Sequence, residues 1–129
     1  MKVLSIKEPF ATLIKDGVKI YETRSWKTNY RGELFIHASL GISKSSNVES
    51  GMKFLKTQIK PGCILCKCIL EDCIPMTDDF INYINNETNE YNYGRYEVGR
   101  YAWKLKLVEV LEQPIEAKGK LGIWNIEEK

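Results

Sequence analysis

Apolar and polar residues alternate along the first third of the chain in a pattern that predicts strands joined by a short helix. The segment VLSI predicts a short buried strand that begins near Lys2. Pro9 suits the first turn of a helix, the apolar residues after it lie three or four positions apart, and Gly17 is expected to end it. The β-rich segments VKIYETRSW and ELFIHAS then predict two strands, with a turn at residues 29–32 between them.

The middle of the chain predicts a second helix and a long strand. The helix is expected from Ser43 or Ser45 to about Gln58, because apolar residues recur on one face of that segment. A Pro-Gly pair at residues 61–62 indicates a turn, and the run CILCKCILEDCI after it predicts a strand that ends near Ile74.

The four cysteines lie close together in this predicted strand and include a C-x-x-C spacing, which can hold zinc or a redox disulfide. Alternation along a regular strand places Cys66 and Cys68 on one face and Cys63 and Cys73 on the other, so they cannot converge on one ion. With His37 as the single histidine of the chain, we expect buried, reduced thiols and no metal site.

The last part of the chain predicts a capped helix, a loop and two strands. Thr77 is expected to cap a short helix, and residues 85–100, which are polar and have no clear period, are expected to form an exposed loop. YAWKLKLVEVLEQP predicts a long strand and KGKLGIWNI a short one. Five or six strands with two to three helices predict a single α+β domain over residues 1–129, built as a small mixed or antiparallel β-barrel.

Composition and charge exclude some classes of protein. With 43% hydrophobic and 28% charged residues, the chain is expected to fold, and it has neither a membrane-spanning apolar run nor a leader-like start, so a cytoplasmic protein is expected. The net charge is only +2, but residues 1–32 hold seven Lys/Arg and three Asp/Glu, whereas residues 62–99 hold two and seven. A basic side that suits a polyanion is one interpretation, and chance scatter of solvating charges is the other.

Ionisable side chains gather in the segment DGVKIYETRSW, residues 16–26. In a strand that starts near Val18, Glu22 and Arg24 share a face with apolar neighbours, so these charges must be paired or must face a cleft. Lys19 has the opposite parity and can join them only if it lies in the turn before regular pleating begins. The two hypotheses are a ligand-binding cleft and a purely structural salt-bridge network.

Other single side chains are weaker candidates for ligand contact. Lys7 stands at the predicted strand–helix junction, where a phosphate could meet its ammonium group. In the predicted loop, Tyr93 lies near Arg95 and Arg100, and aromatic rings beside arginines suit unpaired bases and phosphates. The glutamates of the same loop favour a lid instead. His37 is more simply a core imidazole.

Four segments of the sequence resemble the ASCH domain, the homology domain named after activating signal cointegrator: LSIKEPFATLIKDGVKIYETRSWKTNYRGELFIHAS, PGCILCKCILEDC, GRYAWKL and KGKLGIW. The G-x-K-x-x-E-x-R element of that family is present as Gly17, Lys19, Glu22 and Arg24. The resemblance implies a PUA-like fold, a small pseudo-barrel with helices around a charged cleft. It also implies binding of RNA, DNA or nucleotides in that cleft.

The resemblance bears on catalysis as well. Some small bacterial members are amidohydrolases that remove the acetyl group from acetylated cytidine, with a lysine that activates a threonine. Lys19 matches that lysine, but Glu22 occupies the place of the threonine. We therefore expect an RNA- or nucleotide-binding module first, with a metal-independent amidohydrolase using Lys19 and Glu22 as the alternative and a protein-interaction adaptor as a further one. No cofactor is expected, and the expected binding residues are Lys7, Lys19, Glu22, Arg24, Tyr93, Arg95 and Arg100.

Overall fold

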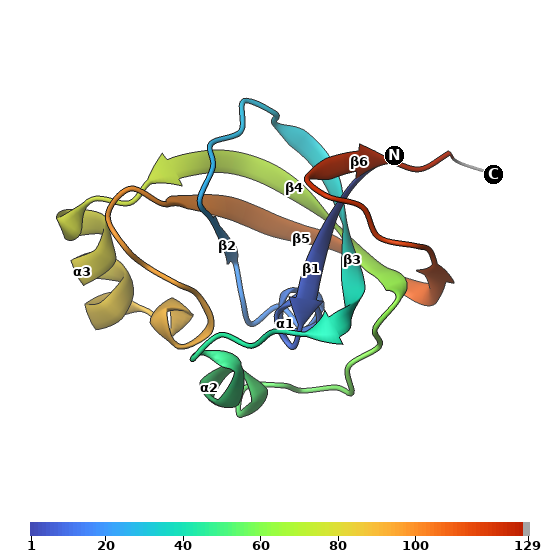
Figure 1. Cartoon of the computed structure of the whole chain (residues 1–129), viewed down its shortest axis with the longest axis horizontal. Helices are drawn as coiled ribbons and strands as arrows, with labels where there is room; N and C mark the ends of the chain where they lie inside the picture. Colours follow the sequence, from blue (N-terminus) through green and yellow to red (C-terminus); the bar gives the residue numbers. More distant parts are fainter. Residues whose placement is uncertain (128–129) are drawn as a thin grey trace.

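The computed structural model describes residues 1–127 and shows a mixed α+β architecture built on one six-stranded sheet (Figure 1). The strands are β1 (Lys2–Glu8), β2 (Tyr21–Arg24), β3 (Gly32–Ile42), β4 (Cys63–Pro75), β5 (Tyr101–Glu116) and β6 (Ile123–Asn125). Their order is β2-β5-β4-β3-β1-β6, and every neighbouring pair is antiparallel except β1 and β3, which run parallel.

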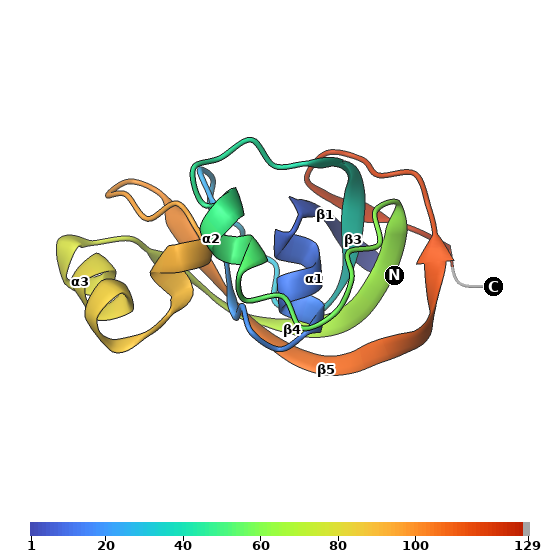
Figure 2. The same ribbon diagram turned by 90° about the horizontal axis from the view of Figure 1, so that it is seen from below.

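Three α-helices and one short 3₁₀ turn accompany the sheet: α1 (Phe10–Lys15), α2 (Val48–Met52), α3 (Asp78–Glu87) and η1 (Glu90–Tyr93). The sheet curls around α1, while α2 and α3 lie further out (Figure 2). Within residues 1–127, none of the helices is long and apolar enough to cross a membrane.

The sheet is not closed into a barrel, which differs from the expected closed form. Its edge strands are β2 and β6, and each pairs with one neighbour only. Because β6 pairs with residues 2–4 of β1, the later part of β1 has β3 as its single strand partner. The side chain of Arg24 bridges the remaining gap, since its Nη2 donates to the Ser5 carbonyl oxygen at 2.9 Å.

The connection from β1 to α1 confirms the predicted helix after Pro9. Glu8 is fully buried, and its carboxylate accepts the Thr12 backbone N–H at 2.8 Å and the Lys60 backbone N–H at 3.1 Å. Gly17 adopts a φ of +76° at the end of α1, a conformation that glycine reaches without a steric penalty. Glu8 thus ties β1, α1 and the segment before β4 together.

The four cysteines all face the same core, which differs from the expected division between two faces. The register between β4 and β5 shifts between Ile64 and Cys66 and between Leu70 and Asp72, and the register between β3 and β4 shifts at the first of these places. Each bulge adds a residue and reverses the alternation of side chains, so residues on both sides of it point inward. The four buried free thiols are Cys63, Cys66, Cys68 and Cys73.

The helix expected from Ser43 or Ser45 to about Gln58 is much shorter in the structure, where α2 has only five residues. Gly51 packs so closely on α1 that a Cβ atom there would lie 3.2 Å from Phe10 Cε1. Beyond α2, the backbone N–H groups of Lys56 and Thr57 donate to the Asp16 carboxylate at 2.9 and 3.2 Å instead of to helical carbonyls. Asp16 therefore anchors this segment.

The exposed loop expected at residues 85–100 is also largely folded. Thr77 caps α3 as predicted, since its hydroxyl accepts the Phe80 N–H at 3.1 Å, but α3 continues to Glu87 and η1 follows. Three side chains of this segment are buried: Glu90, Tyr93 and Tyr96. Its polar composition hid these anchors, because they recur with no helical or strand period.

Candidate functional site

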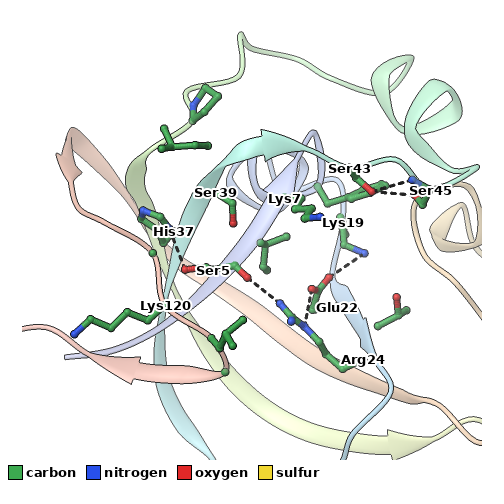
Figure 3. A pocket seen from close by; sticks show the side chains of 18 of the residues that line it. Ser5, Lys7, Lys19, Glu22, Arg24, His37, Ser39, Ser43, Ser45 and Lys120 are labelled. Carbon is green, nitrogen blue, oxygen red and sulfur yellow. Dashed lines mark hydrogen bonds and ion pairs between the residues drawn. The ribbon is translucent and has the colours of Figure 1, made fainter.

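A cavity of about 1300 Å³ opens between β1 and β2 and is shared with the loops around them (Figure 3). Strand β3, the end of β5 and the segments before α2 and after η1 contribute to its lining. All seven binding residues expected from the sequence line this cavity: Lys7, Lys19, Glu22, Arg24, Tyr93, Arg95 and Arg100.

Lys19 enters the cavity from the turn between α1 and β2. The backbone N–H groups of Val18 and Lys19 both donate to the Leu13 carbonyl oxygen, at 3.0 and 3.1 Å, which turns the chain before pleating begins. The Lys19 ammonium donates to the Tyr93 carbonyl oxygen at 2.7 Å and lies 3.8 Å from Glu22 Oε1. This turn explains how a residue of the wrong strand parity joins the cluster.

Lys19 is buried, with only 2% of the residue exposed to solvent. Desolvation lowers the pKa of the Lys19 ammonium below its usual range, and the nearby carboxylates of Glu22 and Glu90 oppose that shift. A buried ammonium of this kind is more readily deprotonated than a surface lysine. It is also more strongly attracted to any anion that enters the cavity.

Glu22 and Arg24 share one face of β2, as the alternation predicted. Glu22 Oε2 accepts from Arg24 Nε at 3.1 Å, and Arg24 Nη2 reaches the Ser5 carbonyl of β1. Lys19, Glu22 and Arg24 therefore form a continuous cation–anion–cation row along the cavity wall, visible in Figure 3. The alternating charges hold one another in place and still face the cavity.

Glu90 is a buried acid whose position here no sequence pattern predicted. Its carboxylate accepts the backbone N–H groups of Ile20 and Tyr21 at 3.1 and 3.0 Å, and so it fixes η1 to the start of β2. Burial raises the pKa of the Glu90 carboxyl, and the charge of Lys19 and the two N–H donors act in the opposite direction. The only sequence signal was an acidic residue among aromatic ones.

The aromatic and basic residues at the end of η1 and after it differ in burial. The Tyr93 ring is buried against Phe54, with ring centroids 5.3 Å apart, so its backbone carbonyl and not its face serves the Lys19 cluster. Arg95 is exposed and pairs with Glu97 at 3.0 Å. Arg100 donates from Nε to the Arg95 carbonyl at 3.1 Å, and burial lowers the pKa of its guanidinium.

A second polar cluster lies on the opposite wall. His37 is almost fully buried, as expected of a core imidazole, yet it lines the cavity and contacts Ser5, whose hydroxyl is 3.0 Å from His37 Nδ1. The strand expected over KGKLGIWNI is shorter in the structure, where β6 begins only at Ile123. Residues 117–122 before it line this wall instead, which no sequence pattern indicated.

The charges that line the cavity are mostly positive, although the whole chain carries only +2. Its lining acids are Glu22 and Glu116. Its lining cations are Lys7, Lys19, Arg24, Arg95, Arg100, Lys118 and Lys120. A concave surface with this excess of cations attracts anions and raises their local concentration.

Two observations limit the chemistry of the site. Among residues 1–127, no three His, Cys, Asp or Glu side chains gather closely enough to hold a metal ion. The Thr23 hydroxyl, which is the nearest threonine in sequence to Lys19, accepts the Arg95 backbone N–H at 3.2 Å. This hydrogen bond ties β2 to the segment after η1.

Comparison with known proteins identifies the family. The family model of the ASCH domain matches residues 4–116, which include the whole Lys19, Glu22 and Arg24 row. The comparison with curated proteins finds no match. Since the family match covers most of the 129 residues, the chain belongs to the ASCH domain family.

Proposed function

We propose that this ASCH domain binds nucleic acid, in first place single-stranded RNA or a nucleotide derived from it, in the cavity between β1 and β2. The observation that carries the proposal is the gathering of cations in one concave site that also contains a buried, cation-flanked carboxylate. Cations meet phosphate, and a carboxylate accepts hydrogen bonds from a base.

The row on β2 gives each of its members a role toward such a ligand. The Lys19 ammonium has three N–H groups, one of which donates to the Tyr93 carbonyl, and it approaches an anion or a base oxygen with the others. Arg24 presents a guanidinium whose orientation is fixed by Glu22 and Ser5. Glu22 accepts from an exocyclic amino group, a hydrogen bond that pure phosphate binding would not need.

Fluorescence titration of an Arg24→Ala protein with short single-stranded RNAs tests this proposal. Loss of one phosphate contact is expected to weaken binding and to reduce the slope of log K against log salt by about 0.7. Lys104→Ala is the matched control, because Lys104 is an exposed cation on β5 that does not line the cavity. Equal affinities and equal salt slopes for the Arg24→Ala and control proteins would contradict the proposal.

A metal-independent amidohydrolase is the second candidate, and the burial of Lys19 beside Glu22 is the observation that favours it. In this reaction Glu22 takes a proton from water, the water oxygen attacks the amide carbon, and Lys19 stabilises the negative charge on the carbonyl oxygen. The C–N bond then breaks, and the amine leaves with the proton. Incubation with acetylated nucleosides separates the candidates, since a binding module releases no acetate.

A further inference from the structure

The segment after β5, residues 117–122, forms one wall of the cavity, and we call it the C-terminal strap. It lies beyond residues 4–116, the part of the chain that the family model matches. Even so, every residue of the strap lines the cavity that contains Lys19 and Arg24. The strap therefore belongs to the candidate site by position, although neither the motif nor the family match includes it.

The backbone of the strap is held by hydrogen bonds to the body of the sheet. His37 Nε2 donates to the Ala117 carbonyl oxygen at 2.6 Å, and the Ala117 N–H donates to the Gly62 carbonyl at 3.1 Å. The Ser5 hydroxyl lies 3.0 Å from His37 Nδ1 and accepts the Trp124 Nε1–H at 3.0 Å. One buried network thus joins β1, β3, the strap and β6.

Gly119 also passes close to this network. A Cβ atom at Gly119 would lie 2.9 Å from Ser5 Oγ, closer than real Cβ atoms come, and 3.0 Å from His37 Cε1, which is a very tight contact. Only glycine allows the backbone to pass this close without displacing the imidazole or the hydroxyl. The strap is consequently fixed in position and is not a loosely attached connection.

The longer side chains of the strap contrast with its fixed backbone, because they are exposed. Lys118 and Lys120 are exposed, and neither takes part in an ion pair within residues 1–127. Leu121 is 99% exposed. Figure 3 shows Lys120 at the end of the cavity away from Lys19, with its ammonium 5.9 Å from the Trp124 ring.

The size of the cavity indicates a ligand longer than one nucleotide. Pockets that enclose a small molecule measure about 300–1,000 Å³, and this cavity measures about 1300 Å³. Figure 3 places Lys19 toward one end of the cavity and Lys120 toward the other. A mononucleotide at the row would leave the strap lysines without a phosphate to contact.

We propose that the C-terminal strap is a second subsite, at which Lys118 and Lys120 contact the phosphates of a neighbouring nucleotide while Leu121 packs against its base or ribose. The ligand is then a single-stranded oligonucleotide that runs from the β2 row to the strap, and not a free nucleoside or mononucleotide. This inference rests on the proposed function, and it adds a ligand class and three residues to it.

The test is a binding titration of a labelled single-stranded RNA octanucleotide, with ribonucleoside monophosphates as competitors. In the double variant Lys118→Ala/Lys120→Ala, the salt slope for the octanucleotide is expected to fall by about 1.4, since each lost phosphate contact removes about 0.7. Each contact contributes about fivefold at about 0.1 M relative to 1 M salt, so the loss of affinity is about 25-fold at the lower salt. The inhibition constants of the mononucleotides are expected to stay unchanged.

The matched control is Lys104→Ala/Lys106→Ala, which removes two exposed cations from β5 outside the cavity and changes the net charge equally. An octanucleotide affinity equal to that of this control overturns the strap subsite. If Arg24→Ala still weakens binding in that case, the proposed function survives, whereas no effect in either variant refutes both.

Leu121→Ser supplies a further readout, because it leaves the charge unchanged. It is expected to weaken octanucleotide binding several-fold without altering the salt slope, since the contact it removes is apolar. Cations beside an exposed leucine would also suit an anionic membrane surface, so binding to anionic lipid vesicles is measured as well. Loss of vesicle binding in the strap variants, with RNA binding unchanged, would overturn the proposal.

Discussion

Glu90 offers the sharpest test of how the site is held together, because two substitutions there predict opposite results. Its Oε1 atom accepts both the Ile20 and the Tyr21 backbone N–H groups, at 3.1 and 3.0 Å. In Glu90→Ala both donors lose this acceptor, the Tyr21 N–H at a buried place and the Ile20 N–H at a partly buried one, and η1 loses this attachment to β2. In Glu90→Gln a single carbonyl oxygen at the same place can still accept both.

The magnitudes follow from these contacts. A donor left without a partner costs about 1–3 kcal/mol, so the loss of the acceptor for two donors in Glu90→Ala is expected to lower the free energy of unfolding by about 2–6 kcal/mol. Glu90→Gln keeps both acceptor contacts and removes a desolvated charge, so a change within about 1 kcal/mol is expected. Urea denaturation followed by tryptophan fluorescence and circular dichroism measures both values. Equal destabilisation by the two substitutions would refute the reasoning.

The pH dependence adds a second readout for Glu90. Burial raises the pKa of its carboxyl above the ordinary value of 4.5, with the charge of Lys19 acting against that shift. The folded protein therefore binds the proton more tightly than the unfolded chain does, and the corresponding stability is present below pH 4.5 and lost as the pH rises through the folded pKa. The stability of the wild type relative to Glu90→Gln should decline over that window. A difference that is independent of pH would contradict the assignment.

Two further predictions concern the strap and the segment after α2. Gly119→Ala is expected to destabilise the protein by about 1–3 kcal/mol, because its Cβ would overlap Ser5 Oγ. Thermal or urea denaturation measures this, with Gly41→Ala as the control, since nothing lies within 4 Å of a Cβ at Gly41. Equal stabilities of the two variants would contradict the close approach at Gly119. At Asp16 burial raises the pKa, but the hydrogen bonds from Thr57 and Lys56 outweigh it and lower the pKa below 3.8. The stability advantage of the wild type over Asp16→Asn should therefore be present above pH 3.8 and disappear as the pH falls through the folded pKa; an advantage that persists in strong acid would contradict this.

The sequence predicted most strands and the first helix because their periodicity is local. β5 alternates over residues 103–107. Gly17 marks the end of α1 through its backbone conformation, and Thr77 marks the start of α3 through its side-chain hydroxyl. The failures depend on distant contacts. Lys56 and Thr57 were expected to be helical, but their backbone N–H groups donate to Asp16 instead. The sheet stays open because β2 ends at Arg24.

The cysteines show the same limit in another form. A strand pattern predicts which face a residue occupies only while the pleat is regular, and bulges in β4 bring Cys63 and Cys66 into one core despite their opposite parity. Bulges depend on pairing with β3 and β5, which the sequence of β4 alone does not contain.

The candidate site was predictable where the motif is compact and unpredictable where distant segments meet. Lys19, Glu22 and Arg24 lie within six residues of sequence, so strand parity and the turn after Gly17 suffice to place them together. Glu90 lies beside this cluster although it comes from a segment that precedes β5, and the strap reaches the same cavity from beyond β5. Neither position follows from periodicity, because each is set by how β2 and β6 dock at the sheet edges.

An NMR titration with single-stranded RNA shows directly whether nucleic acid binds in the cavity between β1 and β2. Backbone amide shifts are expected to concentrate at residues that line the cavity, including Thr23, Arg24, Gly94 and Gly119, and to weaken as salt is added. The outer face of β5 near Lys106 and helix α3 are expected to stay unchanged. Shifts confined to those surfaces, or none in the cavity at saturating RNA, would contradict the account.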